Sequence, residues 1–126
     1  MAQQGGSDAI PRALSVSGTV EFQDVREPAY NVTLYVRVQD TPHADASATT
    51  IAEMVIRGVN IVPGGAPIPF TVDGIPPNPG ALYTVRVLAD VDGDGRVSRG
   101  DFVSTQSSPL ETGKSVGLRI AARRVG

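Results

Sequence analysis

Residues 90–101 read DVDGDGRVSRGD, an acidic, glycine-rich stretch between two segments that have the composition of β-strands. Before it, residues 82–89 are rich in β-branched and aromatic side chains and place four residues on one face: Tyr83, Val85, Val87 and Ala89. After it, residues 102–106 are again β-prone and stop at Ser-Ser-Pro. Neither flank has the 3.6-residue apolar spacing of an amphipathic helix. We therefore expect a β-hairpin whose turn is the acidic stretch.

The oxygen-bearing residues of this stretch have the spacing of an EF-hand calcium loop. Carboxylates occupy loop positions one, three, five and twelve, a glycine occupies position six, and a hydroxyl occupies position nine. Calcium prefers six to eight oxygen ligands, and Gly95 permits the sharp turn that brings the Asp side chains together. Position seven would offer its backbone carbonyl. The predicted calcium ligands are therefore Asp90, Asp92, Asp94, Arg96 through its carbonyl, Ser98 and Asp101.

Two departures and one alternative qualify the calcium prediction. Asp101 stands where an EF-hand has a bidentate Glu, so a weaker or more compact site is expected. The loop also resembles that of a dockerin, but a dockerin continues into a helix and carries two such loops. The alternative is an ordinary solvated turn, because Asp-Gly pairs also favour hairpins and Arg96 and Arg99 could neutralise the acids. Against it, three carboxylates at alternate positions repel one another unless neutralised.

The remaining strand patterns are separated by clusters of turn residues. Residues 15–22 and 31–39 alternate, and their apolar faces consist of Val16, Gly18, Val20 and Phe22 in the first and Val32, Leu34, Val36 and Val38 in the second. Residues 45–57 fit a helix capped by Asp45 or a strand, and their β-branched pairs favour the strand. Residues 68–72 are predicted to be an edge strand because Pro67 and Pro69 lack the N–H that a central ladder needs. Residues 109–113 are predicted to be a turn, and residues 116–122 form the last strand pattern.

Composition limits the fold class. The 126 residues suit a single domain, with residues 1–12 as a disordered lead-in and residues 13–126 as the folded part. Aromatic residues make up only 5% of the chain, which has 14 Gly and 10 Pro, so many turns and few large side chains are expected. We predict an all-β fold, a seven-stranded antiparallel β-sandwich of immunoglobulin or transthyretin type, with the calcium-type loop inside one hairpin.

Several function classes are disfavoured by composition. The net charge of −2 implies no nucleic-acid partner, and the absence of Cys removes disulfides, thiolate chemistry and a lipobox. His43 is the only histidine, so most nucleophile–base pairs are excluded and no enzyme is expected. No apolar run approaches the ~20 residues of a transmembrane helix. No signal peptide is apparent, so the protein is expected in the envelope or outside the cell if an export signal was removed, and otherwise in the cytoplasm.

Short sequence pieces over residues 15–106 carry a resemblance to a known family. They are Ser17-Gly18-Thr19-Val20, the Pro/Ala/Asp-rich residues 40–46, Ile51-Ala52-Glu53, Pro67-Ile68-Pro69-Phe70 and Tyr83-Thr84-Val85-Arg86-Val87. In these the chain resembles the YbaY-type lipoprotein family, which includes the pilotins of type III secretion. The resemblance implies a small β-sandwich, mostly anchored to a bacterial outer membrane; pilotins assist secretin assembly by binding another protein. The missing lipobox Cys and the calcium-type loop depart from that pattern.

The resulting hypothesis is a non-catalytic, calcium-binding module with a protein-binding or assembly role in the bacterial envelope. Its protein partner is unknown. One alternative is a metal-dependent enzyme that uses the acidic loop to hold a catalytic ion. The other is a purely structural domain whose acidic loop binds no metal.

Overall fold

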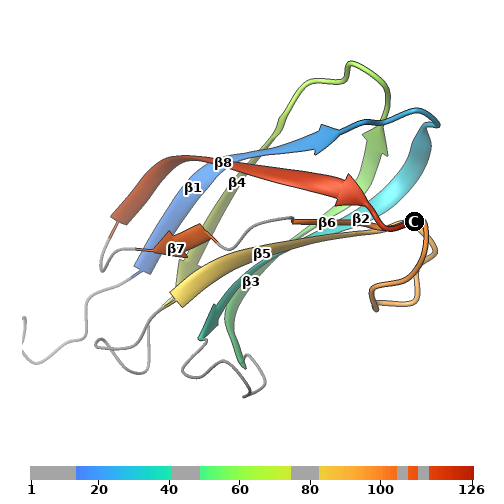
Figure 1. The fold of residues 1–126 in the computed structure, drawn as a ribbon. Helices are drawn as coiled ribbons and strands as arrows, with labels where there is room; N and C mark the ends of the chain where they lie inside the picture. The colour runs from blue at the N-terminus through green and yellow to red at the C-terminus, as the bar shows by residue number, and fades with distance from the viewer. Residues whose placement is uncertain (1–13, 41–48, 75–82, 105–107, 111–113) are drawn as a thin grey trace, which may run out of the picture.

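The computed structural model describes residues 14–40, 49–74, 83–104, 108–110 and 114–126, in which the regular elements are strands (Figure 1). Within these ranges, no helix is long and apolar enough to span a membrane. The strands in chain order are β1 (Leu14–Gln23), β2 (Ala29–Asp40), β3 (Thr49–Ile61), β4 (Ile68–Gly74), β5 (Tyr83–Asp90), β6 (Phe102–Ser104), β7 (Ser108–Leu110) and β8 (Lys114–Arg124).

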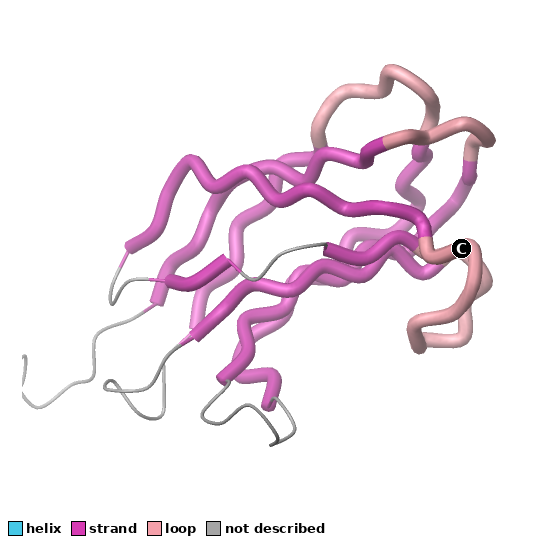
Figure 2. Tube along the Cα trace, viewed as in Figure 1, coloured by secondary structure: helices cyan, strands magenta, loops and turns pink. Residues whose placement is uncertain are grey.

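All of these strands belong to one sheet. Its spatial order is β3-β2-β5-β6-β8-β1-β4, and the short β7 pairs with β5 outside this order. Strands β1 and β8 run parallel, whereas the other paired strands are antiparallel. The prediction of a seven-stranded antiparallel sandwich is therefore wrong, because a single sheet curls into a nearly closed barrel (Figure 2). The two-residue side-chain period is the same in both architectures, so it could not distinguish them.

The two edges of the sheet, β3 and β4, lie against each other without forming a ladder. The backbone N–H of Thr71 in β4 donates to the sulfur of Met54 in β3 at 3.4 Å. A Cβ added at Gly74 would lie 2.8 Å from the Cβ of Ala52, so the two backbones come close there. The two edges thus approach each other near Met54 and near Ala52.

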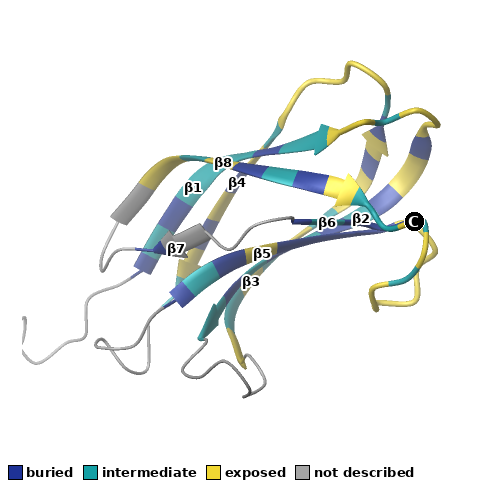
Figure 3. Cartoon of the chain, in the orientation of Figure 1, coloured by how far each residue is buried: buried dark blue, intermediate teal, exposed yellow. Residues whose placement is uncertain are grey.

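The core fills the inside of the curved sheet, as the alternation predicted (Figure 3). The four predicted inward residues of β2 are completely buried: Val32, Leu34, Val36 and Val38. Those of β5 are also buried: Tyr83, Val85, Val87 and Ala89. Because every second residue points inward, the outer face of the barrel carries the alternate residues of each strand, which include polar side chains such as Arg37 and Arg86.

Most of the predicted strands are confirmed, with two qualifications. The ambiguous residues 45–57 are a strand from Thr49 onward, and residues 45–48 lie outside the described part of the chain. The prediction of a turn over residues 109–113 is wrong at its start, because Pro109 lies in β7 opposite Thr84. A proline is compatible with a short strand that pairs on one side only. Residues 1–12, the expected lead-in, are outside the described ranges.

Strand β1 meets β8 at Gly18, where the parallel pairing has an irregular register. A Cβ at this position would overlap the backbone carbonyl oxygen of Leu118 and lie 2.9 Å from its Cβ. We predict that Gly18→Ala lowers the free energy of unfolding by about 1–3 kcal/mol, because the two backbones must separate. Urea denaturation measures the change. Gly126→Ala is the control, since a Cβ there meets no atom within 4 Å, and equal stability of the two variants would contradict the prediction.

Candidate functional site

The acidic loop, residues 90–101, brings together the four aspartates that the sequence singled out. One carboxylate oxygen from each of Asp90, Asp92, Asp94 and Asp101 lies within 4.8 Å of the others. Asp90 and Asp101 are buried, with 3% and 0% of their surface exposed, whereas Asp92 and Asp94 are exposed. The loop joins β5 to β6, which pair as an antiparallel hairpin as predicted. Two acids are thus fixed at the barrel rim and two project from the turn.

The buried carboxylates organise the loop by accepting backbone hydrogen bonds. Asp90 accepts from the N–H of Gly93 at 3.0 Å and from that of Gly95 at 2.7 Å. Asp101 accepts from the N–H of Val91 at 2.8 Å and from that of Ser98 at 2.9 Å. Each carboxylate has about four lone-pair sites, so these bonds leave acceptor capacity on both aspartates.

The exposed part of the loop has the tight turns that the glycines were expected to permit. Gly93 and Gly95 have φ values of 79° and 74°, in the left-handed region that favours glycine. The Ser98 hydroxyl lies 2.7 Å from an oxygen of Asp92 and 3.0 Å from one of Asp101, so it joins the two halves of the loop. Arg96 donates its backbone N–H to Asp94 at 2.9 Å. The role of its carbonyl as an ion ligand stays a prediction.

The pKa values of Asp90 and Asp92 are shifted in opposite directions. Burial raises the pKa of Asp90 above its ordinary value, although the N–H donors of Gly95 and Gly93 act against this. The Ser98 hydroxyl lowers the pKa of Asp92. A cation among these oxygens would favour the ionised forms of Asp90 and Asp92.

The C-terminal end of the loop is attached to the segment that follows β8. The N–H of Gly100 donates to the carbonyl of Val125 at 2.8 Å, and the N–H of Val125 donates to the carbonyl of Asp101 at 2.7 Å. The Arg124 guanidinium lies 4.6 Å from the centre of the Phe102 ring. In Figure 1 the loop accordingly lies beside the C-terminus. This attachment positions Asp101 and the loop against the barrel.

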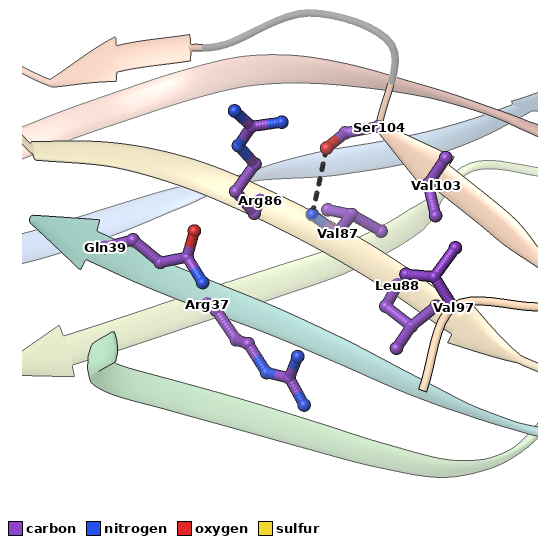
Figure 4. Close-up of a pocket in the computed structure, with 8 residues that line it drawn as sticks. All are labelled: Arg37, Gln39, Arg86, Val87, Leu88, Val97, Val103 and Ser104. Atoms are coloured by element: carbon purple, nitrogen blue, oxygen red, sulfur yellow. Dashed lines mark hydrogen bonds between the residues drawn. The ribbon is translucent and has the colours of Figure 1, made fainter. Parts of the chain in front are cut away.

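A pocket that sequence reasoning missed lies on the outer face of β2, β5 and β6, beside the loop (Figure 4). Its volume is about 360 Å³. Four polar residues and four apolar residues line it: Arg37, Gln39, Arg86 and Ser104, and Val87, Leu88, Val97 and Val103. The available signal was Leu88, an apolar residue at an outward position of its strand. Val97, an aliphatic residue in an otherwise polar loop, was a second signal.

The comparison with protein families identifies the chain. The sequence model of the type III secretion system lipoprotein chaperone family (YscW) matches residues 11–118. The chain belongs to this family. The YscW family is described by a chaperone role, which is non-enzymatic, and its lipoprotein character associates it with the envelope. The pilotin-like part of the sequence resemblance is thereby confirmed.

A solved structure has the same fold as this YscW family member. It is described as an alternative pilotin from the type II secretion system of Vibrio cholerae, with 22% sequence identity and a TM-score of 0.68. The match covers 91% of this chain and 99% of the pilotin chain. A search of curated proteins found no match. At this identity the match supports the barrel-like fold and does not identify binding residues of this chain.

Proposed function

We propose that this protein is a pilotin-type chaperone that binds a secretin subunit in the bacterial envelope and assists its assembly. The observation that carries the proposal is the match of the YscW family model, which extends from residue 11 to residue 118 and so includes β1 to β7. The fold shared with a pilotin of type II secretion supports it. The function is protein binding, and the barrel acts as a rigid scaffold for an outer binding surface.

The in-cell test is co-expression with the secretin encoded in the same genome. The full-length natural protein should increase the amount of SDS-resistant secretin multimer in the outer-membrane fraction and should co-purify with the secretin. A matched strain expresses the secretin alone. If the secretin forms the same amount of multimer in both strains and does not co-purify with the protein, the proposed function is wrong.

We also propose that the acidic loop binds one calcium ion, which stabilises the loop without catalysis. The support is the twelve-residue ligand order together with the convergence of four carboxylates within 4.8 Å. Asp90, Asp92, Asp94 and Asp101 would supply side-chain oxygens, Ser98 its hydroxyl and Arg96 its carbonyl. A chain of hydrogen bonds through Ser98 already holds the loop in this shape, so binding would need little rearrangement.

We predict that calcium raises the melting temperature relative to EDTA. Binding at a hundredfold excess over Kd contributes about 2.7 kcal/mol, which corresponds to about 10 °C for a domain of this size. Differential scanning fluorimetry measures the shift. The double variant Asp92→Ala/Asp94→Ala should lose it, whereas Asp73→Ala, which removes an exposed acid from β4, should keep it. Equal midpoints for the wild-type protein in both buffers would show that the loop is only a turn.

A further inference from the structure

The pocket on the outer face is lined by two arginines that occupy directly opposed positions of neighbouring strands. Arg37 of β2 pairs directly with Arg86 of β5 in the ladder. Like charges at directly opposed positions destabilise a sheet unless they are neutralised. Glu53 neutralises Arg37 at 2.6 Å, and the Arg37 guanidinium also lies 4.7 Å from the centre of the Tyr35 ring. The positive charge of Arg86 is therefore not neutralised by this ion pair.

Arg86 is exposed and forms no ion pair within the part of the chain that the structure describes. In Figure 4 its side chain extends from β5 in the direction opposite to that of Arg37. A guanidinium binds a carboxylate through two parallel hydrogen bonds. The neighbouring Gln39 amide donates to the Thr50 hydroxyl at 3.2 Å, so Arg86 is the donor that this end of the pocket offers. This end of the pocket is chemically suited to an acidic side chain.

The other end of the pocket is apolar. Leu88 points to the outer face of β5 by alternation, yet only 5% of its surface is exposed. Val97, which comes from the acidic loop, and Val103, from β6, line the same space. Val97 is 60% exposed, so this wall has apolar surface that solvent covers in the free protein. Burying that surface against a partner would be favourable at about 25 cal/mol per Å².

The floor of the pocket is fixed where the ladder on one side of β5 is interrupted. Leu88 pairs with Val103 of β6, whereas Val85 pairs with Ser108 of β7, so the two registers differ by two residues. Between them, the buried N–H of Val87 donates to the Ser104 hydroxyl at 3.1 Å instead of to a carbonyl (Figure 4). The Val87 N–H at the floor of the pocket thus has a hydrogen-bond partner within the protein. The pocket is formed before any ligand binds.

We propose that this pocket docks a segment of a protein partner that presents an acidic side chain next to a bulky apolar one. The acid pairs with Arg86, and the apolar side chain packs against Leu88, Val97 and Val103. The volume of about 360 Å³ is near the lower end of ligand pockets. It accommodates a few side chains, and the short apolar wall offers little to a lipid chain. The identification of the partner as a secretin rests on the proposed function. The chemistry of the docked segment is inferred from the side chains that line the pocket.

The first test compares binding of purified secretin to variants of the full chain. Arg86→Glu should weaken binding at least tenfold, because it replaces a charge-assisted hydrogen bond with repulsion. Val97→Ser should weaken it to a lesser extent. Arg57→Glu, at another exposed arginine on β3, is the matched control and should bind as the wild-type protein does. If the wild-type protein binds secretin and Arg86→Glu binds equally well, the pocket proposal is overturned while the proposed function stands.

The second test does not require the secretin. Nuclear magnetic resonance of the ¹⁵N-labelled chain is recorded with a blocked hexapeptide containing Glu-Leu and with its Gln-Leu and Lys-Leu counterparts. The Glu-Leu peptide should shift the amides of Arg86, Leu88, Val97 and Val103, the Gln-Leu peptide should do so more weakly, and the Lys-Leu peptide should not. The absence of shifts in the pocket, or equal shifts with all three peptides, overturns the proposal. So do pocket shifts caused only by phosphatidylglycerol vesicles, which would indicate a lipid headgroup.

Discussion

Replacing Phe102 with Ala is expected to lower the free energy of unfolding by about 3–5 kcal/mol. Phe102 is completely buried, and its ring meets that of Phe22 edge to face, with the centroids 5.3 Å apart. It also connects three strands, because it lies in β6 opposite Ala89 of β5 and Arg124 of β8. Truncation would leave a cavity at the point where the hairpin joins the rest of the barrel. Such a loss is a large part of the ~5–15 kcal/mol that stabilise a typical domain.

Urea unfolding, followed by circular dichroism, measures this effect on purified Phe102→Ala protein. Tyr30→Ala is the control, since Tyr30 is also aromatic and is 65% exposed; its loss should change stability by no more than about 0.5 kcal/mol. A change below about 1 kcal/mol for Phe102→Ala would mean that the packing between β5, β6 and β8 differs from the one described.

Replacing Asp101 with Ala is expected to lower the free energy of unfolding by about 2–4 kcal/mol even in EDTA. The Asp101 side chain accepts hydrogen bonds from the N–H groups of Val91 and Ser98 and from the Ser98 hydroxyl. Without it, two backbone donors at the barrel rim lose their partner, and each costs part of its desolvation penalty. The effect is structural, so it is separate from any contribution of an ion.

The same urea experiment in EDTA tests this prediction with two further variants. Asp101→Asn keeps one acceptor oxygen, so its free energy of unfolding should lie between that of Asp101→Ala and that of the wild-type protein. Asp94→Ala removes an exposed acid that accepts from the N–H of Arg96 and should have little effect on stability. If Asp101→Ala and Asp94→Ala are equally mild, Asp101 does not organise the loop.

Local patterns in the sequence predicted the local structure well. The alternation in residues 31–39 identified four side chains that are fully buried in β2, because the inward position of a strand residue depends only on its neighbours in the chain. The ligand spacing in residues 90–101 likewise predicted that four aspartates would converge. Both signals lie within a dozen residues, where geometry is set by the backbone of one segment.

Features that depend on pairing between distant segments could not be predicted in this way. The parallel pairing of β1 with β8 brings the first and last strands together, and nothing in either strand specifies that partner. The pocket on the outer face has the same origin, because Arg37 and Arg86 become neighbours only through the β2–β5 ladder. The close contact at Gly18 was also missed, since a glycine on an apolar face is equally compatible with a small core residue.

The fold and the proposed function are connected through the outer surface of the barrel. Because the interior is filled by side chains, the proposed function requires a partner to bind at the outer face or at the loops at the rim. The acidic loop contributes to both candidate sites, through its aspartates on one side and through Val97 on the other. A variant that disorders the loop should therefore also weaken partner binding.

The most direct test of the central claim is isothermal titration calorimetry of the purified chain with soluble segments that together span the secretin from the same genome. The account predicts saturable binding with one chain per secretin segment and a complex that elutes as one peak in gel filtration. The absence of binding heat, together with separate elution of the two proteins, would contradict the assignment of this protein as a secretin chaperone.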